Sequence, residues 1–343
     1  MNVVVVAPVW FPVPPTAYGG IEWIVSLLAD GLFDAGHDVT LFASGDSRTK
    51  GELASVYRRA PSDRIGQTYW ELRHLLGALD RGPEFDIVND HTGMLGLLVG
   101  GLLDTPVVHT VHGPLNGEPG EMYAQICRVN PRARLISVSL NQRRPRPELP
   151  WVANCPNAID FSLYPVHPHR GDYLLFLGRM TAAKGCHRAI AAALASGVPL
   201  KIAGKNREPE EQQYFREFVE PHLSEEVEYL GEVNHGEKVE LLQNARATLF
   251  PIRWEEPFGL VMIESMACGT PVIAARWGAV PEVIEDGRSG IIVDDYRQMA
   301  AALPRADDLE PLEIRAYAEE NFSAERMVSD YVAAFEATIA GSG

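Results

Sequence analysis

Residues 250–274 read FPIRWEEPFGLVMIESMACGTPVIA, which predicts the end of a strand, a loop with two carboxylates, a helix and a second strand. Pro251 ends the first strand, because proline removes a hydrogen bond from the sheet. Pro257 suits the first turn of the helix, where a missing N–H has no effect. We expect the helix to continue to about Cys268 and the next strand to occupy residues 270–274. Strand, helix and strand in this order are typical of an α/β fold.

Two glutamates in this stretch are separated by seven residues: Glu256 precedes the helix and Glu264 lies within it. Helical spacing places Glu264 beside the apolar stripe of the helix, where a carboxylate needs a partner. A salt bridge or a solvated face would explain either glutamate alone. Residues 259–261 add the free N–H groups of a helix N-terminus, which bind anions. Carboxylates for hydroxyl groups together with amides for phosphate favour a sugar nucleotide as ligand.

The spacing Glu256-x7-Glu264 within EPFGLVMIESMACGTPVIA resembles the signature of family 4 of the retaining glycosyltransferases, which have the GT-B fold. The resemblance implies an α/β architecture of two doubly wound Rossmann-like domains that face a central cleft. It also implies that Glu264 holds the ribose hydroxyls of a nucleotide-sugar donor and that Glu256 contacts the donor sugar. The other donor-binding residues implied in this segment are Phe258, Gly259, Leu260 and Val261.

The composition predicts two globular domains with an acidic surface. The chain has 343 residues, of which 46% are hydrophobic and 22% charged, and its net charge is −16. This charge argues against nucleic acid or an anionic membrane as the main partner. A nucleoside diphosphate can still bind, provided that cations gather at its site.

The cysteines and the apolar segments predict a cytoplasmic location. The four cysteines (Cys127, Cys155, Cys186 and Cys268) are far apart and form no C-x-x-C pair, so we expect free thiols in a reducing compartment. The first residues, MNVVVVAPVW, predict a strand and not a signal peptide. The longest apolar run, residues 94–103, is too short to span a bilayer. No transmembrane segment is expected, and peripheral contact with a membrane stays open.

A doubly wound unit begins at the N-terminus. Residues 3–7 predict a buried strand, and after a proline-rich loop the pair Gly19-Gly20 precedes a helix that ends near Gly36. The pair is not a G-x-G-x-x-G fingerprint, and two glycines alone indicate only a tight turn. In the family a glycine pair lies here beside the donor diphosphate, since glycines let the backbone approach a phosphate. The resemblance therefore implies that Gly19 and Gly20 bind the donor.

Two histidines follow predicted strands of this unit. His91 comes after a strand at residues 85–89, and His112 comes after a strand at residues 106–111. Ligands bind at this carboxyl edge of open α/β sheets, although a single histidine in a loop is most often a surface residue. His112 resembles the family histidine that contacts the donor sugar, and His91 is expected to face the acceptor. A strand at residues 134–138 is expected to close the sheet.

A proline-rich segment, residues 143–171, predicts the connection between the domains. We interpret its arginines as a solvated basic patch in preference to a site for an acceptor phosphate or an anionic membrane; they are Arg143, Arg144 and Arg146. We expect residues 1–160 to form a domain on the acceptor side and residues 161–322 a domain on the donor side. Residues 323–343 are expected to form a helix that crosses back to the first domain.

The cations that the acidic composition requires appear early in the second domain. Arg179 and Lys184 follow a predicted strand at residues 173–177, and Thr181 is expected to cap a helix that reaches Leu194. Two cations at the start of a helix can converge on one phosphate, although two surface cations would look the same. In the family, this arginine and this lysine bind the donor diphosphate and stabilise the leaving group.

These features predict a retaining hexosyltransferase that moves a sugar from a nucleoside-diphosphate donor to a hydroxyl of a sugar, a lipid-linked or a small-molecule acceptor. The residues expected to carry the reaction are His112, Glu256, Arg179 and Lys184. The family reacts on the front face of the sugar, with the donor phosphate assisting deprotonation of the acceptor. No cofactor or metal is expected, because the sequence lacks the D-x-D by which metal-dependent glycosyltransferases hold a cation.

Other classes fit the sequence less well. If Glu256 and Glu264 lay on one helix, they would be roughly 12 Å apart, whereas glycosidase carboxylates are roughly 5–9.5 Å apart. A loop could bring them closer. The two cations together with the two glutamates argue against a GT-B-fold epimerase, and the intact motifs argue against a non-catalytic nucleotide-sugar-binding partner protein. The missing glycine fingerprint disfavours a nicotinamide dehydrogenase. The nucleotide base, the sugar and the acceptor stay open.

Overall fold

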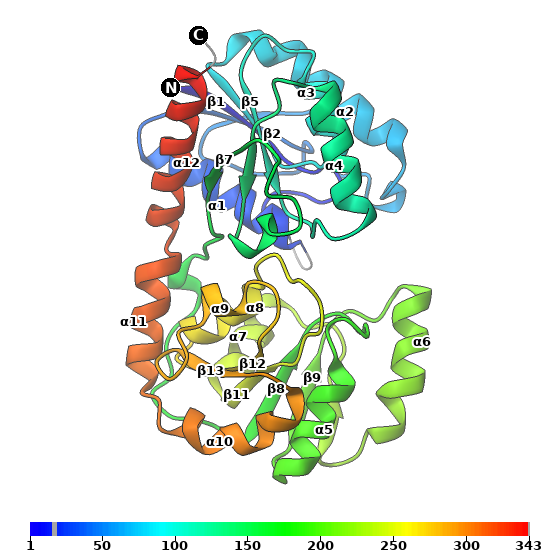
Figure 1. The fold of residues 1–343 in the computed structure, drawn as a ribbon, viewed down its shortest axis with the longest axis vertical. Helices are drawn as coiled ribbons and strands as arrows, with labels where there is room; N and C mark the ends of the chain where they lie inside the picture. The colour runs from blue at the N-terminus through cyan, green and yellow to red at the C-terminus, as the bar shows by residue number, and fades with distance from the viewer. Residues whose placement is uncertain (16–18, 342–343) are drawn as a thin grey trace. The chain divides into compact units, whose positions relative to one another are not determined.

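The computed structural model describes residues 1–15 and 19–341, which form two compact units (Figure 1). Unit 1 comprises Met1–Ile159 together with Ala324–Gly343, and unit 2 comprises Asp160–Ser323. Each unit has its own parallel sheet with helices on its faces. Within the described ranges, no helix combines the length and the apolar character that crossing a membrane requires.

Unit 1 is built on a seven-stranded parallel sheet with the strand order β3-β2-β1-β4-β5-β6-β7. Its strands are β1 (Asn2–Val6), β2 (Asp38–Phe42), β3 (Glu52–Ala54), β4 (Ile87–Asp90), β5 (Val107–Val111), β6 (Leu135–Ser137) and β7 (Trp151–Asn154). Its helices are α1 (Gly20–Asp34), α2 (Thr68–Arg81), α3 (Met94–Gly100), α4 (Glu118–Val129) and α12 (Ala324–Ala340). The central strands are buried on both faces, which explains their unbroken apolar runs.

The C-terminal helix α12 is an integral part of unit 1. It packs against α1 and β7, and its side chains Tyr331 and Phe335 are completely buried. A Cβ atom at Gly31 of α1 would lie 2.5 Å from Val328, so the absence of a side chain allows the two helices to approach closely.

The prediction that a strand at residues 134–138 closes this sheet was wrong, because β7 lies beyond β6. β7 falls within residues 143–171, which the sequence had indicated as a connection only. Every residue of β7 is half-buried, and its apolar run, residues 151–153, is only three residues long and follows a proline, so the proline-rich composition concealed this edge strand.

Unit 2 is built on a six-stranded parallel sheet with the strand order β10-β9-β8-β11-β12-β13. Its strands are β8 (Tyr173–Leu177), β9 (Leu200–Ala203), β10 (Val227–Tyr229), β11 (Ala245–Phe250), β12 (Val272–Ala275) and β13 (Gly290–Val293). Its helices are α5 (Cys186–Ser196), α6 (Pro209–Phe218), α7 (His235–Gln243), α8 (Leu260–Ala267), α9 (Val280–Val283), α10 (Met299–Asp307) and α11 (Pro311–Phe322).

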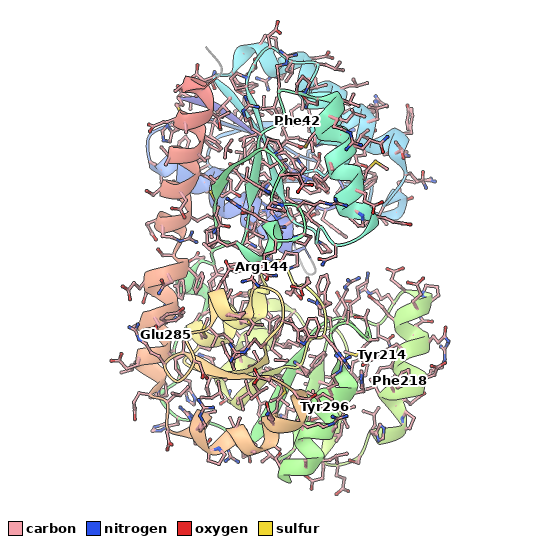
Figure 2. The ribbon with its side chains drawn as sticks, in the orientation of Figure 1. Phe42, Arg144, Tyr214, Phe218, Glu285 and Tyr296 are labelled. Atoms are coloured by element: carbon pink, nitrogen blue, oxygen red, sulfur yellow. The ribbon has the colours of Figure 1, made fainter. Side chains whose placement is uncertain are left out.

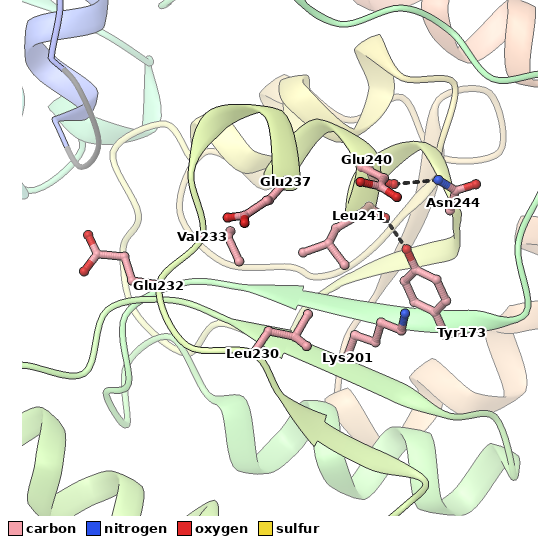
Figure 3. Close-up of a pocket in the computed structure, with 9 residues that line it drawn as sticks. All are labelled: Tyr173, Lys201, Leu230, Glu232, Val233, Glu237, Glu240, Leu241 and Asn244. Atoms are coloured by element: carbon pink, nitrogen blue, oxygen red, sulfur yellow. Dashed lines mark hydrogen bonds between the residues drawn. The ribbon is translucent and has the colours of Figure 1, made fainter.

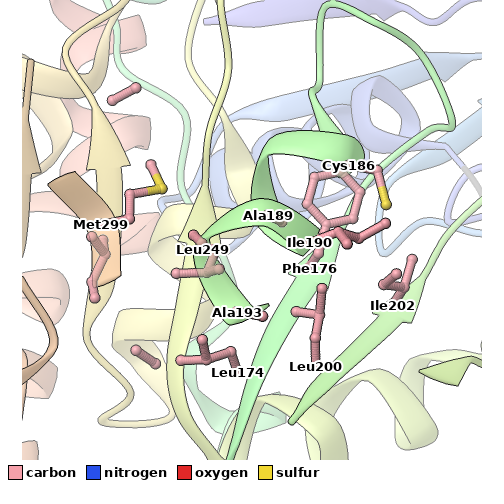
Figure 4. Close-up of a cluster of buried hydrophobic side chains, with 14 of the residues drawn as sticks. Leu174, Phe176, Cys186, Ala189, Ile190, Ala193, Leu200, Ile202, Leu249 and Met299 are labelled. Atoms are coloured by element: carbon pink, nitrogen blue, oxygen red, sulfur yellow. The ribbon is translucent and has the colours of Figure 1, made fainter. Parts of the chain in front are cut away.

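One face of this sheet is sealed by α5 and α10, whose apolar side chains form a core with the strands (Figure 4). Phe176, Ile190 and Leu249 are typical members, each at most 2% exposed. At the side of this core, Tyr214 and Phe218 of α6 lie next to each other with ring centroids 5.4 Å apart (Figure 2). The core fixes the ends of β8 and β11, from which the candidate site extends.

Two helices of unit 2 begin later than the sequence predicted. α8 starts at Leu260 with Gly259 as its N-cap, so Pro257 lies in the preceding loop and not in the first turn. α5 starts at Cys186 with Gly185 as its N-cap, so Thr181 does not cap it. Both N-cap glycines have a positive φ, 89° and 78°, a conformation that L side chains rarely adopt. The loops after β8 and β11 are therefore longer than expected.

Candidate active site

The predicted cations and one predicted glutamate lie on neighbouring loops at the carboxyl edge of the unit 2 sheet. β8 and β11 are adjacent strands; Arg179 and Lys184 follow β8, and Glu256 follows β11. The backbone N–H of Arg253 donates to the carbonyl oxygen of Ala183 at 3.0 Å and joins the two loops. This edge is where ligands bind in open parallel sheets.

Lys184 and Glu256 form an ion pair across these loops. Nζ of Lys184 donates to Oε2 of Glu256, and the same oxygen accepts from Nε1 of Trp254 at 3.0 Å. The ammonium group also lies 5.1 Å from the centre of the Trp254 ring, within range of a cation–π interaction. Oε1 of Glu256 has no donor among residues 1–15 and 19–341. The carboxylate is thus held through one oxygen, and its other oxygen is open.

The backbone of Glu256 is fixed by a close contact with Gly278. A Cβ atom at Gly278 would lie 2.4 Å from both the N and the O atoms of Glu256, and the φ of this glycine is 55°. The N–H of Ala279 donates to the carbonyl oxygen of Glu256 at 3.0 Å. A side chain at position 278 would therefore displace the loop that carries the glutamate.

Glu264 has the same arrangement on α8. Its Oε1 accepts from Nζ of Lys238 at 2.5 Å and from the hydroxyl of Tyr164 at 2.9 Å, whereas Oε2 has no donor in the described part of the chain. Burial raises the pKa of Tyr164, and the negative charge of the neighbouring Glu264 raises it further. The Tyr164 hydroxyl therefore stays protonated and can donate. Lys238 and Tyr164 were not predicted, because 26 and 100 residues separate them from Glu264 and no periodicity connects them.

The segment between Glu256 and Glu264 offers a ligand mainly backbone N–H groups and few side chains. Leu260 and Val261 occupy the first turn of α8, whose N–H groups have no acceptor within the helix. The Phe258 side chain is buried in an edge-to-face contact with Phe322, with centroids 5.8 Å apart. Phe258 could therefore meet a ligand only through its backbone.

Arg179 is not paired with the Lys184–Glu256 group. Its Nη1 lies 3.8 Å from Oε1 of Glu211, a buried carboxylate whose other oxygen accepts the backbone N–H groups of Arg207 and Glu208 at 3.0 and 3.3 Å. The Arg179 side chain is 45% exposed and extends from the loop after β8. The structure thus brings Lys184 and Glu256 together, while it holds Arg179 beside Glu211.

The predicted residues of unit 1 include a pair of histidines in contact. Nδ1 of His91 lies 2.9 Å from Nε2 of His112, and Nε2 of His91 lies 2.6 Å from Oδ1 of Asn89. Burial lowers the pKa of His112 to about 3 and that of His91 well below its usual 6.5, so both rings are neutral at pH 7. His91 is 1% exposed and both its nitrogens are occupied, so the prediction that it faces an acceptor was wrong.

Gly19 and Gly20 lie at the N-terminus of α1, next to the buried carboxylate of Glu22. Gly19 is the N-cap with φ 152°, and a Cβ atom there would lie 2.9 Å from Oε2 of Glu22. Glu22 is 5% exposed, and burial raises its pKa to about 7. Glu22 was not predicted, since a glutamate in the first turn of a helix is common.

A groove of about 600 Å³ lies elsewhere in unit 2, between α7 and the strands β8 to β10 (Figure 3). Its walls include Lys201 and three glutamates at positions 232, 237 and 240, and they include none of the predicted site residues. Across residues 1–15 and 19–341, no group of three or more His, Cys, Asp or Glu side chains is placed to hold a metal ion.

Two family models match the chain and together span most of it. The model "Glycosyltransferase Family 4" matches residues 18–157, and the model "Glycosyl transferases group 1" matches residues 165–321. Among curated relatives, the glycogen synthase of Mycobacterium tuberculosis (strain H37Rv) is 26% identical over 93% of this chain and 89% of the relative. The phosphatidyl-myo-inositol mannosyltransferase of Mycolicibacterium smegmatis is 26% identical over 88% of this chain and 84% of the relative.

Solved structures show the same fold over the whole chain. The glycosyltransferase AviGT4 of avilamycin A biosynthesis is 24% identical, with a TM-score of 0.70 over 99% of this chain and 98% of its own. Anabaena HepE, solved with UDP and glucose, is 18% identical, with a TM-score of 0.74 over 98% of this chain and 100% of its own. The two Rossmann-like units and the similarity to these solved structures together identify the fold as GT-B. The chain belongs to family 4 of the GT-B glycosyltransferases.

Proposed function

We propose that the protein transfers a sugar from a nucleoside-diphosphate donor to an acceptor hydroxyl, with retention of the anomeric configuration and without a metal ion or other cofactor. The observation that carries this proposal is the Lys184–Glu256 pair at the carboxyl edge of the unit 2 sheet. It supplies a cation for a phosphate and an open carboxylate oxygen for a sugar hydroxyl on one small surface. In this reading unit 2 binds the donor and unit 1 serves the acceptor.

The two glutamates would bind different parts of the donor through their open oxygens. Oε2 of Glu264 would accept hydrogen bonds from the ribose hydroxyls, and Oε1 of Glu256 would accept one from the sugar. Lys238 and Lys184 each hold the other oxygen of these carboxylates, and a carboxylate is a stronger acceptor than a neutral oxygen. His112 of unit 1 would contact the donor sugar, and Gly19 and Gly20 would approach the diphosphate.

The cations would stabilise the leaving group. Departure of the nucleoside diphosphate concentrates negative charge on its terminal phosphate, which Arg179, Lys184 and the N–H groups that open α8 would neutralise. These groups would take the place of a metal ion. The family resemblance supports a front-face reaction in which the donor phosphate assists deprotonation of the acceptor.

The remaining assignments are part of the same proposal. The acceptor is a sugar, a lipid-linked or a small molecule and not a nucleic acid, since the net charge is −16. We place the protein in the cytoplasm, because its four cysteines are free thiols. HepE has been solved with UDP and with UDP-glucose, which makes uridine nucleotides the first donors to test.

A thermal-shift screen without metal, followed by product analysis, tests this function. UDP, GDP, ADP and their common sugars are compared; one nucleotide family should raise the melting temperature, because a ligand of the native state stabilises it. The stabilising donor is then incubated with candidate acceptors, and NMR of the product should show the anomeric configuration of the donor. Binding without transfer to any acceptor would favour a non-catalytic protein, and an inverted product would contradict retention.

A further inference from the structure

A continuous chain of hydrogen bonds joins three side chains at the carboxyl edge of the unit 1 sheet. Asn89 Oδ1 lies 2.6 Å from Nε2 of His91, and Nδ1 of His91 lies 2.9 Å from Nε2 of His112. The centroids of the two imidazole rings are 5.1 Å apart and the ring planes differ by 28°, so the rings meet edge to edge through these nitrogens. Asn89 and His91 are buried, whereas His112 is half-buried and ends the chain.

The direction of this chain follows from Asn89. Its Nδ2 lies 3.4 Å from the carbonyl oxygen of Val108 and 3.3 Å from Oγ1 of Thr110. Because a carbonyl oxygen only accepts, the amide nitrogen must face Val108, and Oδ1 must face His91. His91 therefore donates through its Nε2–H.

The protons on both histidines are then determined. A neutral imidazole has one N–H, so Nδ1 of His91 carries a lone pair and accepts the Nε2–H of His112. Nδ1 of His112 in turn carries a lone pair, and it has no hydrogen bond within the described residues. Both rings are neutral at pH 7, so neither has a second N–H with which it could donate at Nδ1.

Helix α12 also packs against His91. The Tyr331 ring lies over His91 at a centroid distance of 6.1 Å and an interplanar angle of 27°. The Tyr331 hydroxyl is 3.2 Å from Oγ1 of Thr110, the same oxygen that Nδ2 of Asn89 contacts. His91 is thus oriented by packing against Tyr331 and by a hydrogen bond at each nitrogen.

We propose that His91 is a positioning residue that fixes His112 in the Nε2–H tautomer and makes Nδ1 of His112 an acceptor for a ligand hydroxyl. The identity of that ligand, the donor sugar, rests on the proposed function. An acceptor nitrogen selects a sugar hydroxyl, which has a proton to donate, over an ionised phosphate oxygen, which has none. His91 would thereby contribute to specificity without touching the ligand.

The test is ¹⁵N NMR of the histidine side chains in the full-length protein without any donor. Nitrogen chemical shifts distinguish an N–H from a lone pair, and the His112→Gln variant identifies the signals of His112. We expect a proton on Nε2 of His112 and none on Nδ1. A proton on Nδ1 in the unsubstituted protein would overturn the proposal.

Two substitutions of His91 extend the test. His91→Gln keeps an acceptor oxygen, so His112 should keep its tautomer and kcat/KM should stay within about threefold. His91→Phe removes the acceptor, so both tautomers should appear and kcat/KM should fall about tenfold, the value of one hydrogen bond. An unchanged spectrum and rate in a folded His91→Phe protein would also overturn the proposal. A protein with the expected tautomer that transfers no sugar would instead contradict the proposed function alone.

Discussion

Lys184 and Glu256 are in direct contact in unit 2, although 72 residues separate them in the chain. The contact exists because β8 and β11 are neighbours in the sheet, although five α-helices and strands intervene in sequence, namely α5, β9, α6, β10 and α7. A cation and a carboxylate at this edge neutralise each other in the free protein. A phosphate that arrives there would share the lysine, and the glutamate would then be free to accept a hydroxyl.

Removing the lysine should affect activity and stability. Lys184→Met should lower the kcat of sugar transfer by about 10²- to 10³-fold, the usual effect of deleting one group that stabilises the developing charge. The two side chains are 19% and 11% exposed, so Glu256 would keep a partly buried charge without its cation. The free energy of unfolding should therefore fall by about 1–3 kcal/mol, as measured by urea denaturation.

The double variant Lys184→Met/Glu256→Gln separates the two effects. It should recover most of the lost stability, because neither partner is left charged, and it should stay inactive. As a matched control, Lys50→Met removes an exposed ion pair with Asp34 in unit 1 and should change stability by less than about 0.5 kcal/mol. Wild-type activity in Lys184→Met would refute the role of the lysine.

Glu264→Ala should weaken nucleotide binding. The substitution removes the open Oε2, and a hydrogen bond to a charged group contributes about 1.5–3 kcal/mol. The Kd for the nucleotide that binds in the thermal-shift screen should rise by about 10- to 100-fold, as measured by isothermal titration calorimetry. Glu225→Ala, an exposed position in a loop of the same unit, serves as the control. Equal affinity in Glu264→Ala and the control would rule out the ribose role.

Glu22 should make unit 1 less stable as the pH rises. Its pKa in the folded protein is about 7, against 4.5 for an ordinary glutamate, so the folded state holds a proton that the unfolded chain has lost between these values. The free energy of unfolding contributed by this group is highest below pH 4.5 and falls by up to about 3 kcal/mol toward pH 7.

Glu22→Gln isolates this effect, because glutamine resembles the protonated acid and does not titrate. Denaturation of the variant and the wild type at pH 5, 6 and 8 should show a stability difference that grows with pH in favour of the variant. Buried histidines such as His74 titrate equally in both proteins and cancel in the difference. The exposed Glu118→Gln should show no such trend. A difference that is constant with pH would mean that Glu22 keeps an ordinary pKa.

Activity should not depend on a divalent cation. We expect the initial rate to be unchanged by EDTA, because Arg179, Lys184 and backbone N–H groups are proposed to stabilise the leaving group. The measurement is the rate of nucleoside-diphosphate release before and after dialysis against the chelator. Loss of activity that magnesium or manganese restores would contradict this mechanism.

The sequence predicted the α/β class because the central strands are buried on both faces and appear as unbroken apolar runs. The edge strands β3 and β7 escaped notice, since they are only three and four residues long, are only partly buried and lie between loop segments. The glycines at positions 185 and 259 were informative about the ends of helices only once their positive φ angles were known. The spacing of residues in a sequence does not show which backbone φ angles they adopt.

The sequence predicted the residues of the candidate site that share one local segment, and it missed those that only tertiary packing brings there. Glu256 and Glu264 share one local segment and were found through it. Lys238 and Tyr164 reach Glu264 only through the packing of α7 and the loop after Asp160, which no spacing in the sequence encodes. His91 was recognised by its place after a strand, but its burial behind His112 depends on α12, more than 200 residues further along the chain.

Because α12 completes unit 1, the chain leaves that unit at Ile159 and returns to it at Ala324. Unit 2 is one uninterrupted stretch of polypeptide, so the ribosome can finish it while unit 1 still lacks its last helix. During synthesis, the residues that orient His91 would therefore be assembled only after Tyr331 has emerged. A fragment that stops at residue 159 is an incomplete half, whereas residues 160–323 are the part that gene fusion or excision could move as a block.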